Sequence, residues 1–469
     1  MSPATTVRIK QVFAAIGTIL ALVTAFQTPP QGVPQPTMYA IGISIWAVFW
    51  WATGVIPEYA TGLIMCTLFA SVNAVPFKVA YGAFAGPVFW LTVTAFVLGA
   101  MAGKVGLLKR MALWVLKIFP PTFNGQVWGL IVSGLVISPL VPSTNGKAAL
   151  SSPLGLTISD TLGLKRGGKA ASGLFLACMT GFYLTSTLFL SGTGSNYMFL
   201  GLLGGTSGNV TWMAWFLRAI VFTVILMVGL GTYICLFCKP DKQVSLPPSY
   251  IKEQLQAIGP MTRDERWTLG IMLTTLLLWM TESLHGIKSG EVGVLAICAL
   301  MVTKVMSRQD FNNKVAWPAV IFIGTLLNMA GVVQALKLDK LLGEALTPIL
   351  SAVASNPYTL VLAIIASLFI LKFAIVSVLT SAVISFFIFS SVAAGMGVDP
   401  WIVAFVAWTS SHIYIFPYQN SAYLCGHYAA ASEMIDHGEG RKHSFIFVLL
   451  CVVAGMASVP FWRLLGLIQ

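Results

Sequence analysis

Long apolar segments follow one another along almost the whole chain, and most could cross a lipid bilayer. About 20 consecutive apolar residues are enough for a transmembrane helix. Of the 469 residues, 57% are hydrophobic and only 9% are charged, whereas about a quarter of a soluble domain is charged. The sequence therefore predicts an all-α membrane protein with many spans. Its net charge of +12 is attributed to cytoplasmic lysines and arginines rather than to nucleic-acid binding.

The apolar segments divide into two halves with a charged segment between them. Residues 1–37 form a first span and its loop, and 239–266 form a cytoplasmic linker that is rich in charged residues. The basic, apolar segment 104–119 is expected to lie in the membrane interface. We predict one repeat over 38–238 and a second over 267–469.

The two halves resemble each other at an offset of about 230 residues, which is the kind of internal repeat to seek first. The segment GPVFWLTVTAFVLGAMAGKVGLLK, from Gly86, is similar to WPAVIFIGTLLNMAGVVQALKLDK, from Trp317. Each half holds five spans and one interrupted segment. Because five is odd, the second half enters the membrane from the opposite face, as in the inverted repeats of many secondary transporters. The prediction is about 11 transmembrane helices.

The interrupted segment of the first half is SPLVPSTNGKAALSSP, at 138–153. Proline breaks a helix, and polar backbone inside a membrane persists only when buried in protein or lining a cavity. We predict a re-entrant hairpin over 124–160; the alternative is a loop between two ordinary spans. An N-terminus in the cytoplasm places 20 of the 27 lysines and arginines on that side, which favours the hairpin. The C-terminus and a second hairpin, 357–395, then face outside.

Four interruptions are paired by the repeat, and they supply the candidate binding residues. Each creates a half-helix whose N-terminus offers free N–H groups to an anion. Two are the hairpin tips, and two are breaks in long spans at 190–196 and 415–420. The candidate substrate-binding residues are Ser143, Thr144, Asn145, Thr193, Asn196, Ser377, Thr380, Pro417, Tyr418, Gln419 and Asn420.

These interruptions resemble the signatures of the divalent anion/sodium symporter family, and the similarity covers nearly the whole chain. The tip Ser143-Thr144-Asn145-Gly146-Lys147 is a permuted form of the family's Ser-Asn-Thr motif. The break Gly192-Thr193-Gly194-Ser195-Asn196 keeps the Gly, Thr and Asn of the family's Gly-Thr-Pro-Pro-Asn. The second tip, Ser377-Val378-Leu379, has lost most of its motif.

The resemblance implies a homodimer in which a transport domain crosses the membrane against a scaffold. The transport domain would contain both hairpins and spans 5, 6, 10 and 11. One sodium ion would bind at Ser143, Asn145 and Gly192. At the second tip, Val378 and Leu379 have replaced side-chain oxygens, so sodium coupling and sodium-independent exchange both stay open.

Several single residues carry further expectations. Lys147 is expected to face the cytoplasmic mouth, with direct anion contact as the alternative. Lys372 lies in an apolar hairpin arm, where it either supplies a coupling charge or reaches the outer surface. His412 is expected to be a neutral packing residue, with a protonatable role as the alternative. Five tryptophans are expected to anchor the interface: Trp50, Trp51, Trp212, Trp215 and Trp317.

These features predict a secondary transporter of a small divalent organic anion, such as succinate or malate. A sulfate or other inorganic-anion transporter of the same fold is the first alternative, and an anion channel is the second. The sequence contains no catalytic or nucleotide-binding motif, so we predict neither an enzyme nor a cofactor beyond a coupling sodium ion. A bacterial inner membrane is the expected location.

Overall fold

The computed structural model describes residues 3–30, 32–204, 207–208, 210–338, 341, 355–374 and 377–469. Within these ranges the regular structure is helical, apart from two isolated β-bridges. Six helical segments are, by length and composition, able to cross a membrane alone. They are Pro87–Lys104, Lys169–Leu188, Trp212–Phe237, Trp317–Ala335, Val378–Gly395 and His437–Leu464.

The two halves contain the same series of helices in the same order. After α1 (Pro3–Phe26), the first half has α2 (Gln35–Thr53), α3 (Glu58–Ser71), α5 (Pro87–Lys104), α7 (Phe123–Ile137), α8 (Thr144–Thr161), α9 (Lys169–Phe182), α10 (Gly194–Leu202) and α11 (Trp212–Phe237). The second has α13 (Arg263–Met280), α15 (Ser289–Val302), α17 (Trp317–Ala335), α19 (Pro357–Ala374), α20 (Val378–Gly395), α21 (Pro400–Ser410), α22 (Ser421–Ala429) and α23 (His437–Leu464). The prediction of a helical membrane protein with paired hairpins and broken spans is confirmed.

The interruptions lie where the sequence predicts them. The first hairpin consists of α7 and α8, with its tip at 138–143. The second consists of α19 and α20; residues 375 and 376 of its predicted tip lie outside the described part of the chain. Short 3₁₀ turns separate α9 from α10, and another separates α21 from α22.

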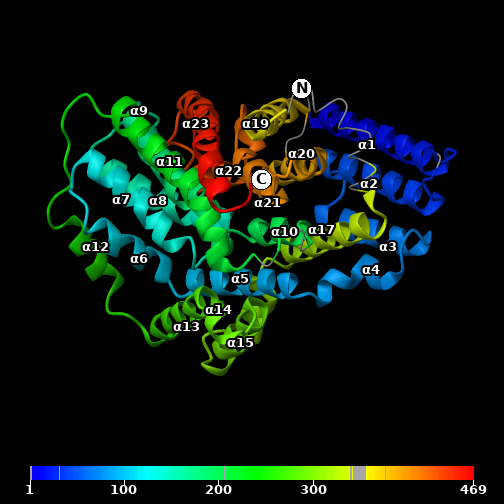
Figure 1. Ribbon diagram of the computed structural model, residues 1–469. Helices are drawn as coiled ribbons and strands as arrows, with labels where there is room; N and C mark the ends of the chain where they lie inside the picture. Colours follow the sequence, from blue (N-terminus) through cyan, green and yellow to red (C-terminus); the bar gives the residue numbers. More distant parts are fainter. Residues whose placement is uncertain are drawn as a thin grey trace.

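The helices pack in two groups, which Figure 1 shows side by side. In one group α1 packs on α2, α3 on α17, and α5 on α15. In the other, α7 packs on α9, α8 on α22, α11 on α23, and α19 on α20 and α21. Helix α10 contacts both groups, because it packs on α5 and α17 and also on α21. The broken first-repeat span therefore joins the two groups.

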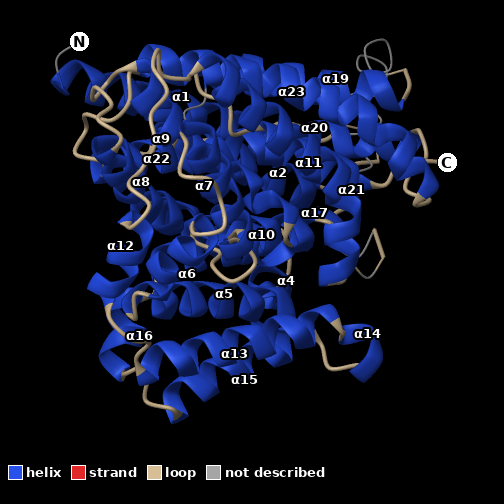
Figure 2. Ribbon diagram, turned by 90° about the vertical axis from the view of Figure 1, so that its left-hand side faces the viewer, coloured by secondary structure: helices blue, strands red, loops and turns tan. Residues whose placement is uncertain are grey.

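The N-terminus and the C-terminus of the chain lie on opposite sides of the molecule. In Figure 2 the N-terminus, α12 (Tyr250–Ile258) and α16 (Arg308–Lys314) lie on the left, while the C-terminus and α14 (Glu282–His285) lie on the right. This arrangement matches an odd number of crossings. We refer below to the N-terminal end and the C-terminal end of the molecule.

The basic segment after α5 packs more deeply than an interfacial helix would. Its helix α6 (Leu107–Leu116) buries seven of its ten residues. Among them is Arg110, whose Nε donates to Glu265 Oε1 at 2.8 Å, so that α6 is fastened to the first turn of α13. The prediction that this segment lies in the membrane interface is not tested by this contact, which shows that one face of α6 packs against the start of α13 through a buried ion pair.

Candidate functional site

The hairpin tips and the broken spans meet at a cavity of about 830 Å³, which we call the central cavity. The first tip contributes Thr144 and Asn145, and the second contributes Ser377. The other helix group forms the facing wall with Trp51 of α2, the start of α3, and Phe322 of α17. The cavity thus lies between the two groups of helices. Its remaining lining residues are Lys10, Ala52, Thr53, Gly54, Glu58, Tyr183, Ser195, Val378, Leu379, Trp408, Tyr418, Gln419, Ser421 and Ala422.

Each of the four half-helices begins with a capping side chain. A cap accepts a hydrogen bond from an N–H group of the first helical turn, which otherwise has no partner. Ser143 accepts from Gly146 N of α8, Thr193 from Ser195 N of α10, Ser377 from Thr380 N of α20, and Asn420 from Tyr423 N of α22, at 3.2, 3.4, 3.2 and 3.0 Å. The polar residues of the interruptions thus start new helices.

Two of these helix starts leave free N–H groups at the central cavity. The first two residues of a helix have no intrahelical acceptor, and no acceptor within the described residues bonds to the N–H groups of Thr144, Asn145, Val378 or Leu379. All four residues line the cavity. A carboxylate there would meet N–H donors and the positive dipole end of a helix. Because these donors are backbone groups, the loss of polar side chains at the second tip does not remove them.

The sequence led us to expect Lys147 at the cytoplasmic mouth of the cavity, but the structure places it elsewhere. Its side chain is fully buried. Nζ donates to Ser186 Oγ at 2.7 Å, to Gly192 O at 2.8 Å and to Ser138 Oγ at 3.2 Å. Three oxygen atoms therefore surround Nζ, and one of them is the carbonyl of Gly192. Oxygen atoms of this kind also bind sodium.

Lys372 is buried in a different way. It is 1% exposed, and its Nζ has no hydrogen-bond partner within the described residues. The alternative in which this lysine reaches the outer surface is wrong. Its backbone carbonyl accepts from Gln419 Nε2 at 2.6 Å, and Gln419 Oε1 accepts from the N–H groups of Ile415 and Phe416. Gln419 therefore joins the second hairpin to the second broken span.

Some of the remaining predicted residues line the wall of the central cavity, and others hold the surrounding backbone in place. Tyr418 is 57% exposed, stacks on Phe416 and lines the central cavity. Thr380 is buried and donates its hydroxyl to Ser377. Pro417 breaks the span but does not line the cavity. Asn420 is a buried cap whose Nδ2 also donates to His412 O.

Asn196 is a supporting residue and does not reach the central cavity. Its Nδ2 donates to Phe189 O at 2.8 Å, and its Oδ1 accepts from Trp408 Nε1 at 2.8 Å. Trp408 ends α21, immediately before the second broken segment. This bond therefore ties the two broken spans together, and in this structure Asn196 supports the site rather than lining the cavity.

We predict that Asn196→Ala destabilises the protein by roughly 2–4 kcal/mol, because it leaves two buried polar groups without a partner. The thermal midpoint of the purified protein in detergent should fall by several degrees in differential scanning fluorimetry. Ser195→Ala is the matched control, since Ser195 borders the cavity and its hydroxyl has no such bond. Equal midpoints for both variants would contradict the supporting role.

Three of the tryptophans that the sequence assigned to the membrane interface are buried. Trp51 is 4% exposed and lines the central cavity. Trp212 donates to Ser191 Oγ and Trp215 to the carbonyl of Thr187, each at 3.0 Å. These two indoles satisfy polar groups in the unwound part of the first broken span. Their position near a span end gave no signal of this role.

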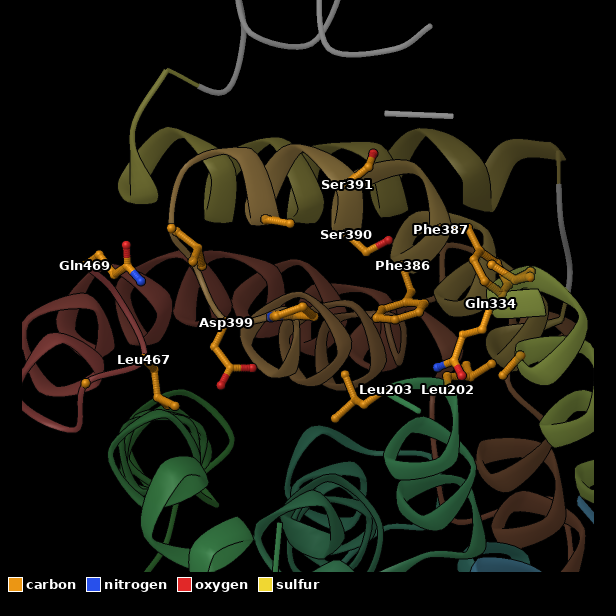
Figure 3. Close-up of a pocket in the computed structure, with 17 residues that line it drawn as sticks. Leu202, Leu203, Gln334, Phe386, Phe387, Ser390, Ser391, Asp399, Leu467 and Gln469 are labelled. Carbon is orange, nitrogen blue, oxygen red and sulfur yellow. The ribbon is translucent and has the colours of Figure 1, made fainter. Parts of the chain in front are cut away.

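A second cavity, of about 590 Å³, lies at the C-terminal end of the molecule (Figure 3). Its wall includes Asp399, Gln334 and the last residue, Gln469, and none of the predicted site residues. Helix α20 begins at the central cavity and ends at this second cavity, and so does α10. Both helices therefore run from one cavity to the other.

Comparisons with known proteins agree with this architecture. Residues 9–468 match the family model described as the sodium:sulfate symporter transmembrane region. The chain is 23% identical over 406 residues to dicarboxylate transporter 1, chloroplastic, of Spinacia oleracea, covering 85% of this chain and 71% of that protein. It is 24% identical over 324 residues to the L-tartrate/succinate antiporter of Escherichia coli K12, and this match covers 67% of this chain and 66% of that protein. The solved YdaH transporter of Alcanivorax borkumensis superposes with a TM-score of 0.55, 13% identity and 98% coverage of both chains, which shows a shared fold.

Proposed function

Because this chain belongs to the sodium:sulfate symporter family of membrane transporters, we propose that it carries dicarboxylates such as succinate or malate. The observation that supports this most is the pair of helix starts, α8 and α20, that present free N–H groups to one cavity. Each helix start can hold one carboxylate. A dicarboxylate could place one carboxylate at each helix start, whereas a sulfate ion has a single anionic group.

The names of relatives favour the same substrate class. A dicarboxylate transporter of Spinacia oleracea and a tartrate/succinate antiporter of Escherichia coli are both similar over most of this chain. Sulfate remains the competing substrate, because the family model bears its name. Apolar side chains such as Phe322 and Leu379 in the cavity suit the methylene groups of a dicarboxylate better than a fully hydrated inorganic ion.

We further propose that transport does not require sodium. The position that the resemblance assigns to the first sodium ion includes Gly192, whose carbonyl accepts from the Lys147 ammonium. A second cation there would meet a positive charge at close range. The lysine charge partly neutralises a bound divalent anion. Exchange of one anion for another is then favoured, since an empty carrier would have to cross with an unneutralised buried charge.

The proposed motion is a displacement of the hairpin-bearing helices against α2, α3, α5 and α17. It is supported by the place of the central cavity between the two helix groups, and by the second cavity at the other end of α20. The resemblance leads us to propose a homodimer as well, with the cavities inside each protomer. A bacterial inner membrane is the proposed location, with the N-terminus in the cytoplasm and the C-terminus outside.

The test is uptake of labelled succinate into proteoliposomes. We predict saturable uptake that is stimulated several-fold by internal succinate or malate, and that is unchanged when external sodium is replaced by choline. Unlabelled malate should compete at least 10-fold better than sulfate. Stronger competition by sulfate than by malate would identify an inorganic-anion carrier. Uptake that internal anion does not stimulate would exclude exchange. Large unitary currents without counterflow would identify a channel.

A further inference from the structure

Of the described residues that line the central cavity, two carry a charge, and both belong to the helix group opposite the hairpins. They are Lys10 of α1 and Glu58, which begins α3. A lysine suits a cavity that attracts anions, because its positive charge raises their local concentration. A carboxylate has the opposite effect, so the proposed binding of a dicarboxylate does not by itself account for Glu58.

The start of α3 is held in place from two directions. The backbone carbonyl of Glu58 accepts from Trp51 Nε1 at 3.0 Å, and Trp51 also lines the central cavity. One turn further along, α3 packs closely against α17, because a Cβ atom at Gly62 would overlap the side chain of Thr325. Glu58 is therefore a fixed part of the wall that faces the hairpin tips.

The carboxylate of Glu58 is not neutralised by a neighbour. Glu58 is exposed, and its side chain makes no hydrogen bond or ion pair within the part of the chain that the structure describes. In the first turn of a helix the macrodipole stabilises a negative charge, so a carboxylate is tolerated at this place without a partner. Because glutamate is normally ionised at neutral pH, its charge acts on any anion that shares the cavity.

A dicarboxylate held at the two tips would present the rest of its carbon chain to the facing wall. That wall contains Trp51, Glu58 and Phe322. A hydroxyl group on the carbon chain carries no charge there, and it can donate a hydrogen bond to a carboxylate. A carboxylate on the chain would instead meet the carboxylate of Glu58, and like charges at close range repel each other.

We propose that Glu58 limits the substrate to two negative charges and thereby excludes tricarboxylates. This inference rests on the proposed function, because it supposes that the tips bind a dicarboxylate. The free N–H groups of the tips attract any carboxylate, so they do not distinguish two charges from three. Specificity often needs an unfavourable contact with the wrong ligand as well as favourable contacts with the right one. Glu58 supplies the unfavourable contact, and dicarboxylates with or without a hydroxyl group remain substrates.

The test compares two anions that differ by one carboxylate. Glutarate and propane-1,2,3-tricarboxylate have the same carbon chain, and the second carries an added carboxylate on the middle carbon. Each is used to inhibit the uptake of labelled succinate into proteoliposomes at about pH 7.5, where carboxyl groups are ionised. We expect the tricarboxylate to inhibit the wild-type protein roughly 30-fold less well than glutarate, because of the added charge pair.

Glu58→Gln removes the charge and keeps the shape of the side chain. The ratio of the two inhibition constants should fall by about 10-fold, and the KM for succinate should fall by about 2- to 5-fold. Glu58→Asp keeps the charge and should keep the ratio within about three-fold of the wild type. Glu253→Gln is the matched control, because Glu253 is an exposed glutamate of α12 that does not line the cavity; it should behave as the wild type.

A second measurement needs no variant. Salt screens the interaction between charges, so the ratio of the inhibition constants in the wild-type protein should fall several-fold between about 0.05 M and 0.5 M ionic strength. A cavity that attracted the third carboxylate would show the opposite change, since screening would then weaken the binding of the tricarboxylate more than that of glutarate. Thermal unfolding shows which variants are folded, and a loss of helix stability alone would not change the ratio.

Each outcome decides between the two proposals. An unchanged ratio in Glu58→Gln, or equal losses in Glu58→Gln and Glu58→Asp, overturns this inference and leaves the proposed function intact. Equal inhibition of the wild-type protein by both anions also overturns it, and would mean that another helix start at the cavity, such as that of α22 at Ser421, accepts the third carboxylate. If succinate, malate and glutarate all fail to compete, the proposed function itself is refuted.

Discussion

Replacing Lys147 by alanine should strongly reduce sodium-free transport and make uptake depend on a small cation. Removal of the ammonium leaves the oxygen atoms of Ser138, Ser186 and Gly192 around an empty space. A charge-assisted interaction contributes about 1.5–3 kcal/mol, so succinate uptake in choline buffer should fall roughly 10- to 150-fold. Sodium ions can enter the space between the oxygen atoms, and uptake in sodium buffer should recover at least partly.

Lys147→Met is the matched control, because its side chain fills the same space without a charge. It should lose uptake as Lys147→Ala does, but sodium should not restore it. Uptake would be measured in proteoliposomes over a series of sodium concentrations at constant ionic strength, after thermal unfolding has shown which variants are folded. If Lys147→Ala transports succinate normally in choline, the lysine does not supply the cation.

Replacing Asn145 by aspartate should raise the KM for succinate by about 100-fold. Asn145 is exposed at the first tip, and its side chain lines the central cavity. A new carboxylate about 5 Å from a substrate carboxylate costs about 3 kcal/mol at an effective dielectric constant near 20. Asn145→Ala removes only a polar contact and should raise KM by roughly 5- to 30-fold.

The control for added charge is Thr157→Asp, on the same helix. Thr157 is exposed, donates its hydroxyl to Pro153 O and does not line the cavity. Its replacement should leave KM within about two-fold of the wild type. Similar KM increases in Asn145→Asp and Thr157→Asp would mean that the first tip is not in the binding site.

Much of this fold could be predicted from the sequence because the signals were local. Prolines and small polar residues mark the interruptions, and caps such as Ser143 and Asn420 are helix-start residues by type. The inverted repeat followed from similarity between segments, and the charge distribution favoured hairpins over crossings. In each case a short stretch of sequence contained the information.

The binding site itself was harder to predict, because it depends on contacts between distant residues. Asn196 looked like a ligand by its position, but it bonds to Trp408, which lies 212 residues away in the sequence. Lys147 looked like a surface cation, and only the folded chain brings Ser186 and Gly192 to its ammonium. Trp51 gave no local signal, because its place in the cavity wall is set by the packing of one helix group against the other.

Helix α20 has open space at both of its ends, since Ser377 lies at the central cavity and Ala394 at the second one. A shift along its axis would enlarge one space while it reduces the other. The total void in the protein would then stay nearly constant, and interior packing would be neither created nor lost. A transition of this kind has a small volume change, so hydrostatic pressure would favour neither end state strongly.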